Sequence, residues 1–412
     1  MPDPTANHRD HTCDVLVVGA GPGGTTAAGL LAQRGVKVLV LDKEPFPRER
    51  IGESLLPGLA PVLERLGVEP DDRTYVYKRG ARFVCERTGR EQSFPFALAL
   101  PGAAAHAWHV DRARFDTELR DRARELGAEI RHGETVVDAG ADEREAWVRT
   151  RDERFTARYL IDASGQSRLL ARRLDAVVPY EQFGRVAVYT HFEDAATDLL
   201  GPDFDIRIML RDDGWGWIIP LPGRRLSIGV VSRNKITREA LDDGLLQGPL
   251  CTRLCASARR LATHVVGNYS YDNRRPSGAR FATVGDAACF LDPVFSSGVT
   301  LAMRGANDVV DILVPALAEN REHDPGLLDA FQRHMQRGYR TFAGLVERFY
   351  HTNFAESYFL GTDLGEDLRR GVMSVLAGDV WRHDNPFQDM LLSARRRART
   401  NPSPVTRNRA NT

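Results

Sequence analysis

The chain has 412 residues, which is long enough to bury a large core and to form two or three structural units in one folded body. Its 56 Lys and Arg residues balance 56 Asp and Glu residues, so no global charge favours nucleic acid or an anionic membrane as a partner. No apolar window of about 18 residues is present, and residues 1–12 lack the apolar stretch of a secretory signal. We therefore expect a cytoplasmic protein that binds neither nucleic acid nor membrane.

The strongest local signal is a glycine-rich turn near the N-terminus. A buried strand is predicted over 14–18, and the G-x-G-x-x-G turn Gly19-Ala20-Gly21-Pro22-Gly23-Gly24 follows it. A helix over 25–34 comes next, and then a second strand over 36–41 that ends in the acid Asp42. The three motif glycines let the backbone approach a pyrophosphate at the helix N-terminus, and the acid accepts hydrogen bonds from ribose hydroxyls. This unit predicts a dinucleotide site, but by itself it does not separate FAD from NAD.

Two later stretches are predicted to return the chain to the same dinucleotide. The first is the apolar strand 159–161 followed by Asp162 to Gly165, and the second is the strand 281–284 followed by Gly285 and Asp286. A nicotinamide dehydrogenase usually needs only the N-terminal turn, so the repeated visits favour FAD lying extended across the domain. We expect the cofactor to contact Gly19, Gly21, Gly24, Asp42, Arg112, Asp162, Gly165, Asp286 and Pro293.

The segment 285–299 also predicts an anion site. It leaves a strand and enters a helix expected over 299–313, whose first turn is rich in Ser and Gly. Backbone N–H groups in a first turn have no intrahelical partner, and the helix dipole favours negative charge there.

Residues 171–264 lose the α/β pattern and are predicted to form a separate antiparallel sheet with strands at 185–192, 205–210, 217–221 and 226–231. In this region Trp215-Gly216-Trp217-Ile218-Ile219-Pro220 places two tryptophans on one face of a strand, either as an aromatic core pair or as a wall of a cavity. Lys78 lies in a further strand predicted over 75–83, where the pattern alone would assign it to solvent. Cys251 and Cys255 have no His or Cys pair nearby, so we expect reduced thiols and no metal site.

The predicted fold class is α/β with α+β character, built around an FAD-binding dinucleotide fold. The expected FAD-binding domain is discontinuous and comprises residues 13–74, 105–170 and 265–318. A substrate-side antiparallel sheet is expected from 75–104 and 171–264, and a C-terminal helical region over 319–392. Residues 1–12 and 393–412 are expected to be unstructured tails. Within the helical region, amphipathic helices are expected over 326–339 and 341–349. The aromatic residues that follow, up to Phe359, suit a lining for a flat apolar substrate.

From Asp14 to about Asp384 the sequence resembles the flavin-dependent halogenases, within the wider family of aromatic flavin monooxygenases. The stretch from Trp215 to Pro220 is similar to their W-x-W-x-I-P pattern. Lys78, followed by Arg79-Gly80-Ala81, falls where those enzymes carry an essential lysine. Asp292-Pro293-Val294-Phe295-Ser296-Ser297-Gly298-Val299 resembles the form found in members that act on phenols and pyrroles, often on a carrier protein. The chain looks shorter after its central helix than the tryptophan-type enzymes and lacks their catalytic glutamate near Ser296, so free tryptophan is not the expected substrate.

The resemblance implies an enzyme that uses reduced FAD from a separate flavin reductase, O2 and chloride or bromide to halogenate an electron-rich aromatic ring, free or carried by an acyl or peptidyl carrier protein. It implies a catalytic Lys78, a halide at the backbone of Ser297 and Gly298, and a substrate tunnel along Trp215, Trp217, Ile219, Pro220 and Phe349. Lys78 would use hypohalous acid either as a charged hydrogen-bond donor or, if burial releases its proton, as a haloamine. The alternatives are an aromatic hydroxylase or isoprenoid-type reductase on the same fold, and a binding protein without activity.

Overall fold

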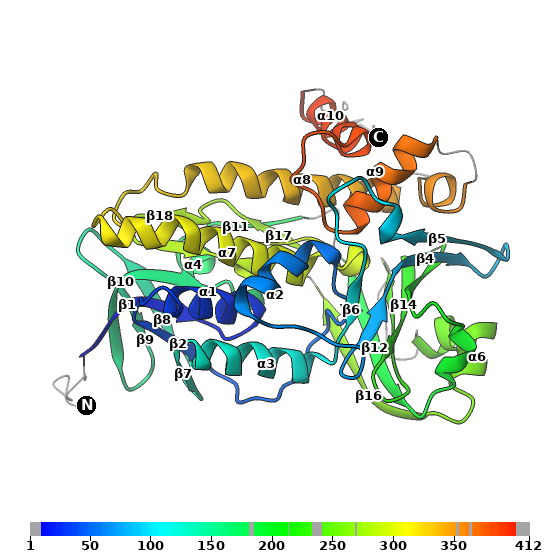
Figure 1. Cartoon of the computed structure of the whole chain (residues 1–412), viewed down its shortest axis with the longest axis horizontal. Helices are drawn as coiled ribbons and strands as arrows, with labels where there is room; N and C mark the ends of the chain where they lie inside the picture. The colour runs from blue at the N-terminus through cyan, green and yellow to red at the C-terminus, as the bar shows by residue number, and fades with distance from the viewer. Residues whose placement is uncertain are drawn as a thin grey trace, which may run out of the picture.

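The computed structural model describes residues 10–180, 185–212, 214–232, 241–267, 270–351, 354–361 and 365–400 (Figure 1). Sheets and helices both contribute to one body, which confirms the predicted mixed α/β class. None of the described helices is both long and apolar enough to cross a bilayer.

The first sheet contains the parallel strands that precede the N-terminal turn and the two later stretches predicted to contact the dinucleotide. Its order is β18-β19-β10-β1-β2-β7, with β9 also on β10 and β8 on β9. The bounds are β1 Asp10–Val18, β2 Val38–Asp42, β7 Glu129–His132, β8 Asp138–Ala141, β9 Ala146–Arg149, β10 Arg154–Asp162, β18 Ser277–Gly278 and β19 Phe281–Thr283. In the register, Asp162 at the end of β10 lies beside Val18 of β1 and Thr283 of β19. The loops after these strands therefore meet at one edge of the sheet.

Helix α1 packs against strands β1 and β2 of this sheet, and it also packs against helices α3 and α7 (Figure 1). The bounds are α1 Pro22–Ala32, α2 Ala60–Leu66, α3 Arg112–Glu125, α4 Leu169–Arg173 and α7 Ser297–Ala318. Helix α1 begins at its proline, a residue suited to the first helical position because it has no N–H to leave unbonded. A 3-10 turn that begins at Pro57 precedes helix α2, which ends before Gly67.

The second large sheet has seven strands in the order β16-β12-β15-β14-β13-β4-β5. The bounds are β4 Gly80–Cys85, β5 Arg90–Pro95, β12 Val186–Glu193, β13 Ile206–Arg211, β14 Gly214–Leu221, β15 Arg225–Ser232 and β16 Arg259–Gly267, with helix α6 Pro249–Leu254 nearby. The predicted strand 75–83 is divided at Arg79. Its first part is β3 Val76–Lys78, which pairs with β6 Ala107–His109, and its second part is β4. A small sheet holds β11 Val177–Pro179, β17 Tyr271–Asn273 and β20 Cys289–Phe290.

The C-terminal part is helical, with α8 Asp329–His351, α9 Glu366–Leu376 and α10 Pro386–Thr400 (Figure 1). Helix α8 is one helix where the sequence suggested two, because its apolar face continues through residue 340. Residues 10–12 and 393–400, which were assigned to unstructured tails, continue β1 and α10 instead. The edge of β10 pairs with residues 10–12, and arginines favour helix after residue 393. The rest of both tails lies outside the described residues.

Candidate active site

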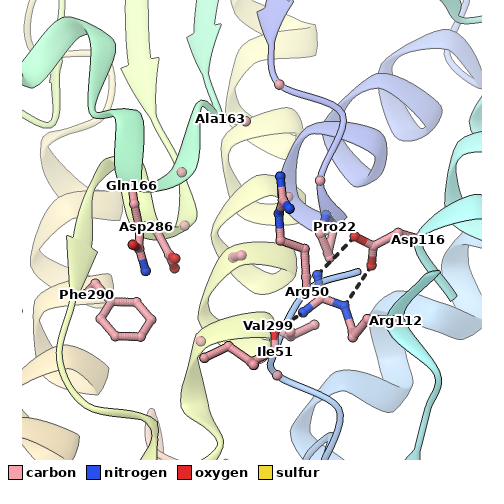
Figure 2. Close-up of a pocket in the computed structure, with 18 of the residues that line it drawn as sticks. Pro22, Arg50, Ile51, Arg112, Asp116, Ala163, Gln166, Asp286, Phe290 and Val299 are labelled. Atoms are coloured by element: carbon pink, nitrogen blue, oxygen red, sulfur yellow. Dashed lines mark hydrogen bonds and ion pairs between the residues drawn. The ribbon is translucent and has the colours of Figure 1, made fainter. Parts of the chain in front are cut away.

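A cavity of about 720 Å³ lies where the loops after β1, β10 and β19 meet (Figure 2). It extends to Trp215, Trp217 and Ile219 of the second large sheet. Its lining includes three groups of predicted residues: the cofactor contacts Gly19, Gly21, Asp42, Arg112, Gly165, Asp286 and Pro293; the halide residues Ser297 and Gly298; and the tunnel residues Trp215, Trp217 and Ile219. Folding thus brings together residues as far apart in the sequence as Val18 and Ala302.

The N-terminal turn leaves room only for backbone. A Cβ on Gly24 would lie 1.9 Å from the carbonyl oxygen of Gly19, and one on Gly19 would lie 2.4 Å from the carbonyl oxygen of Ala163. Gly19 also has a φ of 99°, a conformation that favours glycine. Gly24 does not line the cavity, so it serves close packing of α1 on β1. The turn therefore fits a dinucleotide that approaches the N-terminus of α1 closely.

Asp42 holds this turn in place as well as facing the cavity. Its Oδ2 accepts a hydrogen bond from the backbone N–H of Ala20 at 2.6 Å, and its Oδ1 accepts from Glu44 N at 2.8 Å. The guanidinium of Arg48 donates to both oxygens at 2.9 and 3.1 Å. The sequence indicated the acid but not Arg48, because a loop of varied charges gives no sign of which arginine reaches back.

A buried ion pair lies across the cavity from Asp286 (Figure 2). Arg112 Nε donates to Asp116 Oδ1 at 2.8 Å, and its Nη1 donates to the carbonyl oxygen of Ile51 at 2.7 Å. Burial raises the pKa of Asp286 to about 7, and the charge of Arg112 partly opposes that rise. Arg112 is thus placed to compensate negative charge in the cavity, as a phosphate-bearing cofactor requires.

The loop for which an anion site is predicted leads into the N-terminus of α7. Pro293–Phe295 forms a 3-10 turn, Ser296 follows with a left-handed φ of 55°, and α7 begins at Ser297. A Cβ on Gly298 would lie 3.6 Å from the Phe290 ring and 4.0 Å from Asp286 Oδ1. The start of α7 and the Asp286 carboxyl group therefore share one end of the cavity.

The tryptophan strand β14 forms a wall of the cavity. Trp215, Trp217 and Ile219 line it, and the two indole rings lie 5.6 Å apart between centroids. Each indole N–H is bonded: Trp215 donates to the Tyr350 hydroxyl at 2.8 Å and Trp217 to Ser227 Oγ at 3.1 Å. The structure thus favours the cavity-wall interpretation over a simple core pair.

Pro220, which points to the other face of β14, was expected in the same tunnel. It lines a separate cavity of about 250 Å³ together with Val76 and Phe204.

Lys78 is buried and is not part of the cavity lining. Its side chain is 1 % exposed, its Nζ donates to the carbonyl oxygen of Leu55 at 2.8 Å, and it lies 5.2 Å from the Phe96 ring centroid. Burial lowers the pKa of Lys78 to about 7, against a rise from the charge of Asp205. The interpretation of Lys78 as a solvated strand lysine is therefore wrong.

Asp162 and Phe349 also lie apart from the cavity. Both carboxylate oxygens of Asp162 accept backbone hydrogen bonds, from Ser164 N at 2.9 Å and Leu170 N at 2.8 Å, so this acid shapes the loop instead of facing the cofactor. Phe349 packs edge-on against Phe295, 5.6 Å between centroids, within the core. Pattern alone does not distinguish an aspartate that closes a turn from one that faces a ligand.

Glu53 and His191 form a buried pair that no sequence pattern indicated. His191 Nε2 is hydrogen-bonded to Glu53 Oε1, and Glu53 lines the cavity. Burial opposes protonation of the imidazole, but the hydrogen bond to Glu53 and the charge of Glu53 together outweigh it, so the pKa of His191 is raised. The pair joins residues 138 positions apart, which no local pattern could reveal.

Comparison with known proteins decides the family. The sequence matches the tryptophan halogenase family over residues 14–104 and 97–363. The chain is a flavin-dependent halogenase. A relative of this halogenase is the 1H-pyrrole-2-carbonyl-[peptidyl-carrier protein] chlorinase of Pseudomonas fluorescens, 28 % identical over 90 % of each chain.

Two solved structures resemble this halogenase over almost their whole length. A flavoprotein/dehydrogenase from Cytophaga hutchinsonii has a TM-score of 0.83 and 28 % identity, and covers 95 % of this chain and 99 % of its own. The myxobacterial chondrochloren halogenase, a variant of the FAD-dependent halogenases, has a TM-score of 0.76 and 28 % identity over 93 % and 97 % of the two chains. FAD is therefore the cofactor of this halogenase, and the cavity described above has the backbone turn and the buried arginine to hold it.

Proposed function

We propose that this halogenase uses reduced FAD, O2 and chloride or bromide to halogenate a phenolic or pyrrolic ring. The observation that carries the proposal is Lys78, a buried amine that donates to the carbonyl oxygen of Leu55, the chain neighbour of the cavity-lining Ser54. A buried amine costs stability, so a protein that keeps one at such a place has a use for it. We further propose that a separate flavin reductase supplies the reduced cofactor.

The cofactor would lie between the N-terminal turn and the loop before α7. Reduced FAD with O2 supplies the oxidising power for the halide. The backbone N–H groups of Ser297 and Gly298 would hold the halide, because the first N–H groups of α7 have no intrahelical acceptor and the helix dipole favours an anion. Trp215 and Trp217 would keep the organic substrate away from the cofactor.

The polar atoms around Lys78 suggest how hypohalous acid would reach it. Ser54 lines the cavity, and it bridges to His109 in the neighbouring strand β6. Among the described residues, Ser54 Oγ and His109 Nδ1 have no hydrogen-bond partner although both are buried. They could therefore pass a small polar molecule from the cavity towards Lys78.

Both chemical roles of Lys78 remain available in this setting. With a pKa of about 7, its amine is present in charged and neutral forms near neutral pH. The charged form would donate a hydrogen bond to hypohalous acid. The neutral form would attack the halogen, breaking the O–halogen bond, and the released hydroxide would take a proton from the nitrogen, leaving a haloamine and water. A fall in halogenation as pH rises through about 7 would indicate the first role, and a rise the second.

A carrier protein would present the substrate, as the name of the Pseudomonas fluorescens relative states for its own reaction. The test combines the purified enzyme with FAD, a flavin reductase, NADH, one halide, and phenols or pyrrole carboxylates, free or loaded on a carrier protein. Mass spectra should show replacement of ring hydrogen by halogen only when halide is present. Addition of oxygen without halogen would instead identify a hydroxylase.

A further inference from the structure

Tyr350 joins the tryptophan wall to the loop before α7 through two hydrogen bonds. Trp215 Nε1 donates to the Tyr350 hydroxyl at 2.8 Å, and this hydroxyl donates to Asp292 Oδ2 at 3.0 Å. A phenolic hydroxyl can accept and donate at the same time, so the two bonds are compatible. Trp215 and Asp292 line the cofactor cavity, whereas Tyr350 on α8 is not among the lining residues.

The other oxygen of Asp292 fixes the turn that leads into α7. Asp292 Oδ1 accepts a hydrogen bond from Val294 N at 3.0 Å, inside the 3-10 turn that ends in the left-handed Ser296. The direction of the N–H groups of Ser297 and Gly298 depends on how this turn is held. The Tyr350 hydroxyl therefore acts on the predicted halide site through one intervening carboxyl group.

Asp292 also places a titratable charge beside this loop. Its side chain is buried, and burial raises its pKa to about 7 against the hydrogen bonds from Val294 and Tyr350 and the charge of Arg185. Arg185 lies before β12, with its guanidinium 4.2 Å from the centre of the Tyr350 ring. These groups act on the carboxyl group from the loop itself, from α8 and from the segment before β12.

We propose that Tyr350 is a positioning residue of the halogenase. By holding Asp292 it orients the backbone that binds halide, and by accepting from Trp215 it couples this backbone to the tryptophan wall. The proposal rests on the proposed function, because it takes the start of α7 as the halide site. Tyr350 itself touches neither the halide nor the organic substrate.

The test measures halide binding to the oxidised, FAD-loaded enzyme by the change in flavin fluorescence, so no organic substrate is needed. At about pH 6, below the titration of Asp292, Tyr350→Phe should bind bromide about five to ten times more weakly, which is the effect of one lost hydrogen bond. Trp215→Phe should weaken bromide binding about two- to fivefold although it leaves the loop itself intact. In the double variant the loss of bromide affinity should not exceed that of Tyr350→Phe alone, because both changes break the same series of hydrogen bonds.

The matched control is Tyr358→Phe, which removes the hydroxyl of another half-buried tyrosine that stacks on Phe354. It should bind bromide and FAD like the unaltered enzyme. A second readout is pH: bromide binding should weaken as pH rises through about 7, since ionised Asp292 repels the anion, and Tyr350→Phe should move this midpoint upward. Burial also raises the pKa of Asp286, which lies near Gly298, to about 7, so the pH series is run in an Asp286→Asn background. In that background Asp292→Asn should remove the remaining pH dependence, which keeps the proposal testable if Tyr350→Phe does not fold.

The outcomes separate the two proposals. If the unaltered enzyme binds no bromide, the halide site at α7 is wrong and the role of Tyr350 falls with it. If the unaltered enzyme binds bromide but Tyr350→Phe binds it equally well, or if the effects of Trp215→Phe and Tyr350→Phe simply add, only the role of Tyr350 is overturned.

Discussion

Replacing Lys78 by methionine should stabilise the protein. Burying the charged amine costs free energy, and the difference between its usual pKa of 10.5 and about 7 corresponds to about 5 kcal/mol. Methionine fills similar volume without charge but leaves the Leu55 carbonyl group without its donor, which costs about 1–3 kcal/mol. The net gain is therefore about 2–4 kcal/mol, or roughly 2–5 °C in melting temperature for a chain of this length.

The pH dependence of this gain follows from the direction of the shift. Below about pH 7 the amine is charged in both the folded and the unfolded protein, so the full cost is present. As pH rises from 7 towards 10.5, the folded protein already holds a neutral amine and the cost disappears. Melting temperatures of Lys78→Met and the unaltered protein should therefore differ more at about pH 6 than at about pH 9.

Lys37→Met, at an exposed position, is the control and should change stability by no more than about 0.5 kcal/mol. The reasoning is refuted if Lys78→Met melts at or below the temperature of the unaltered protein at about pH 6, or if its advantage does not shrink at about pH 9. Either result would mean that the Lys78 amine is hydrated in solution.

Three further predictions concern the cofactor cavity. Gly24→Ala should lose FAD binding, measured by flavin content after purification, because the new Cβ would lie 1.9 Å from the Gly19 carbonyl oxygen; a yellow, FAD-loaded variant would contradict this. Asp42→Asn should weaken FAD binding by about tenfold, measured by fluorescence titration, because the amide replaces a charged acceptor; unchanged affinity would remove Asp42 from the cofactor site. Glu53→Gln should destabilise the protein more at about pH 6 than at about pH 9, as measured by thermal melts. The raised pKa of His191 makes the pair stabilising at low pH, and this contribution is lost as pH rises through the pKa of the folded protein. An equal loss of stability at both pH values would show that His191 is neutral throughout.

The parts of the site that the sequence predicted are those with a local physical cause. Gly19 and Gly24 are required because a Cβ would collide with neighbouring backbone, and that requirement is visible as a motif between a strand and a helix. The three loops meet because the carboxyl ends of parallel strands lie at one edge of the sheet. In the sequence, such strand ends are indicated by apolar strands followed by small residues.

The parts that could not be predicted depend on contacts between distant segments. Lys78 looks like a solvated residue on β3, and only the pairing of β3 with β6 and the cover provided by Leu55 and Phe96 bury it. Asp162 ends a strand as a cofactor-binding acid would, yet its oxygens close the loop that follows. Nothing in the sequence near Tyr350 indicates that its hydroxyl lies between Trp215 and Asp292.

The central claim is that Lys78 transfers halogen to the substrate after the halide has been oxidised elsewhere in the protein. The most direct test compares Lys78→Met with the unaltered enzyme in the reconstituted reaction, measuring halogenated product by mass spectrometry and free hypohalous acid by halogenation of monochlorodimedone. We expect Lys78→Met still to oxidise halide and release hypohalous acid, but to give no halogenated substrate. Unchanged substrate halogenation by Lys78→Met would contradict it.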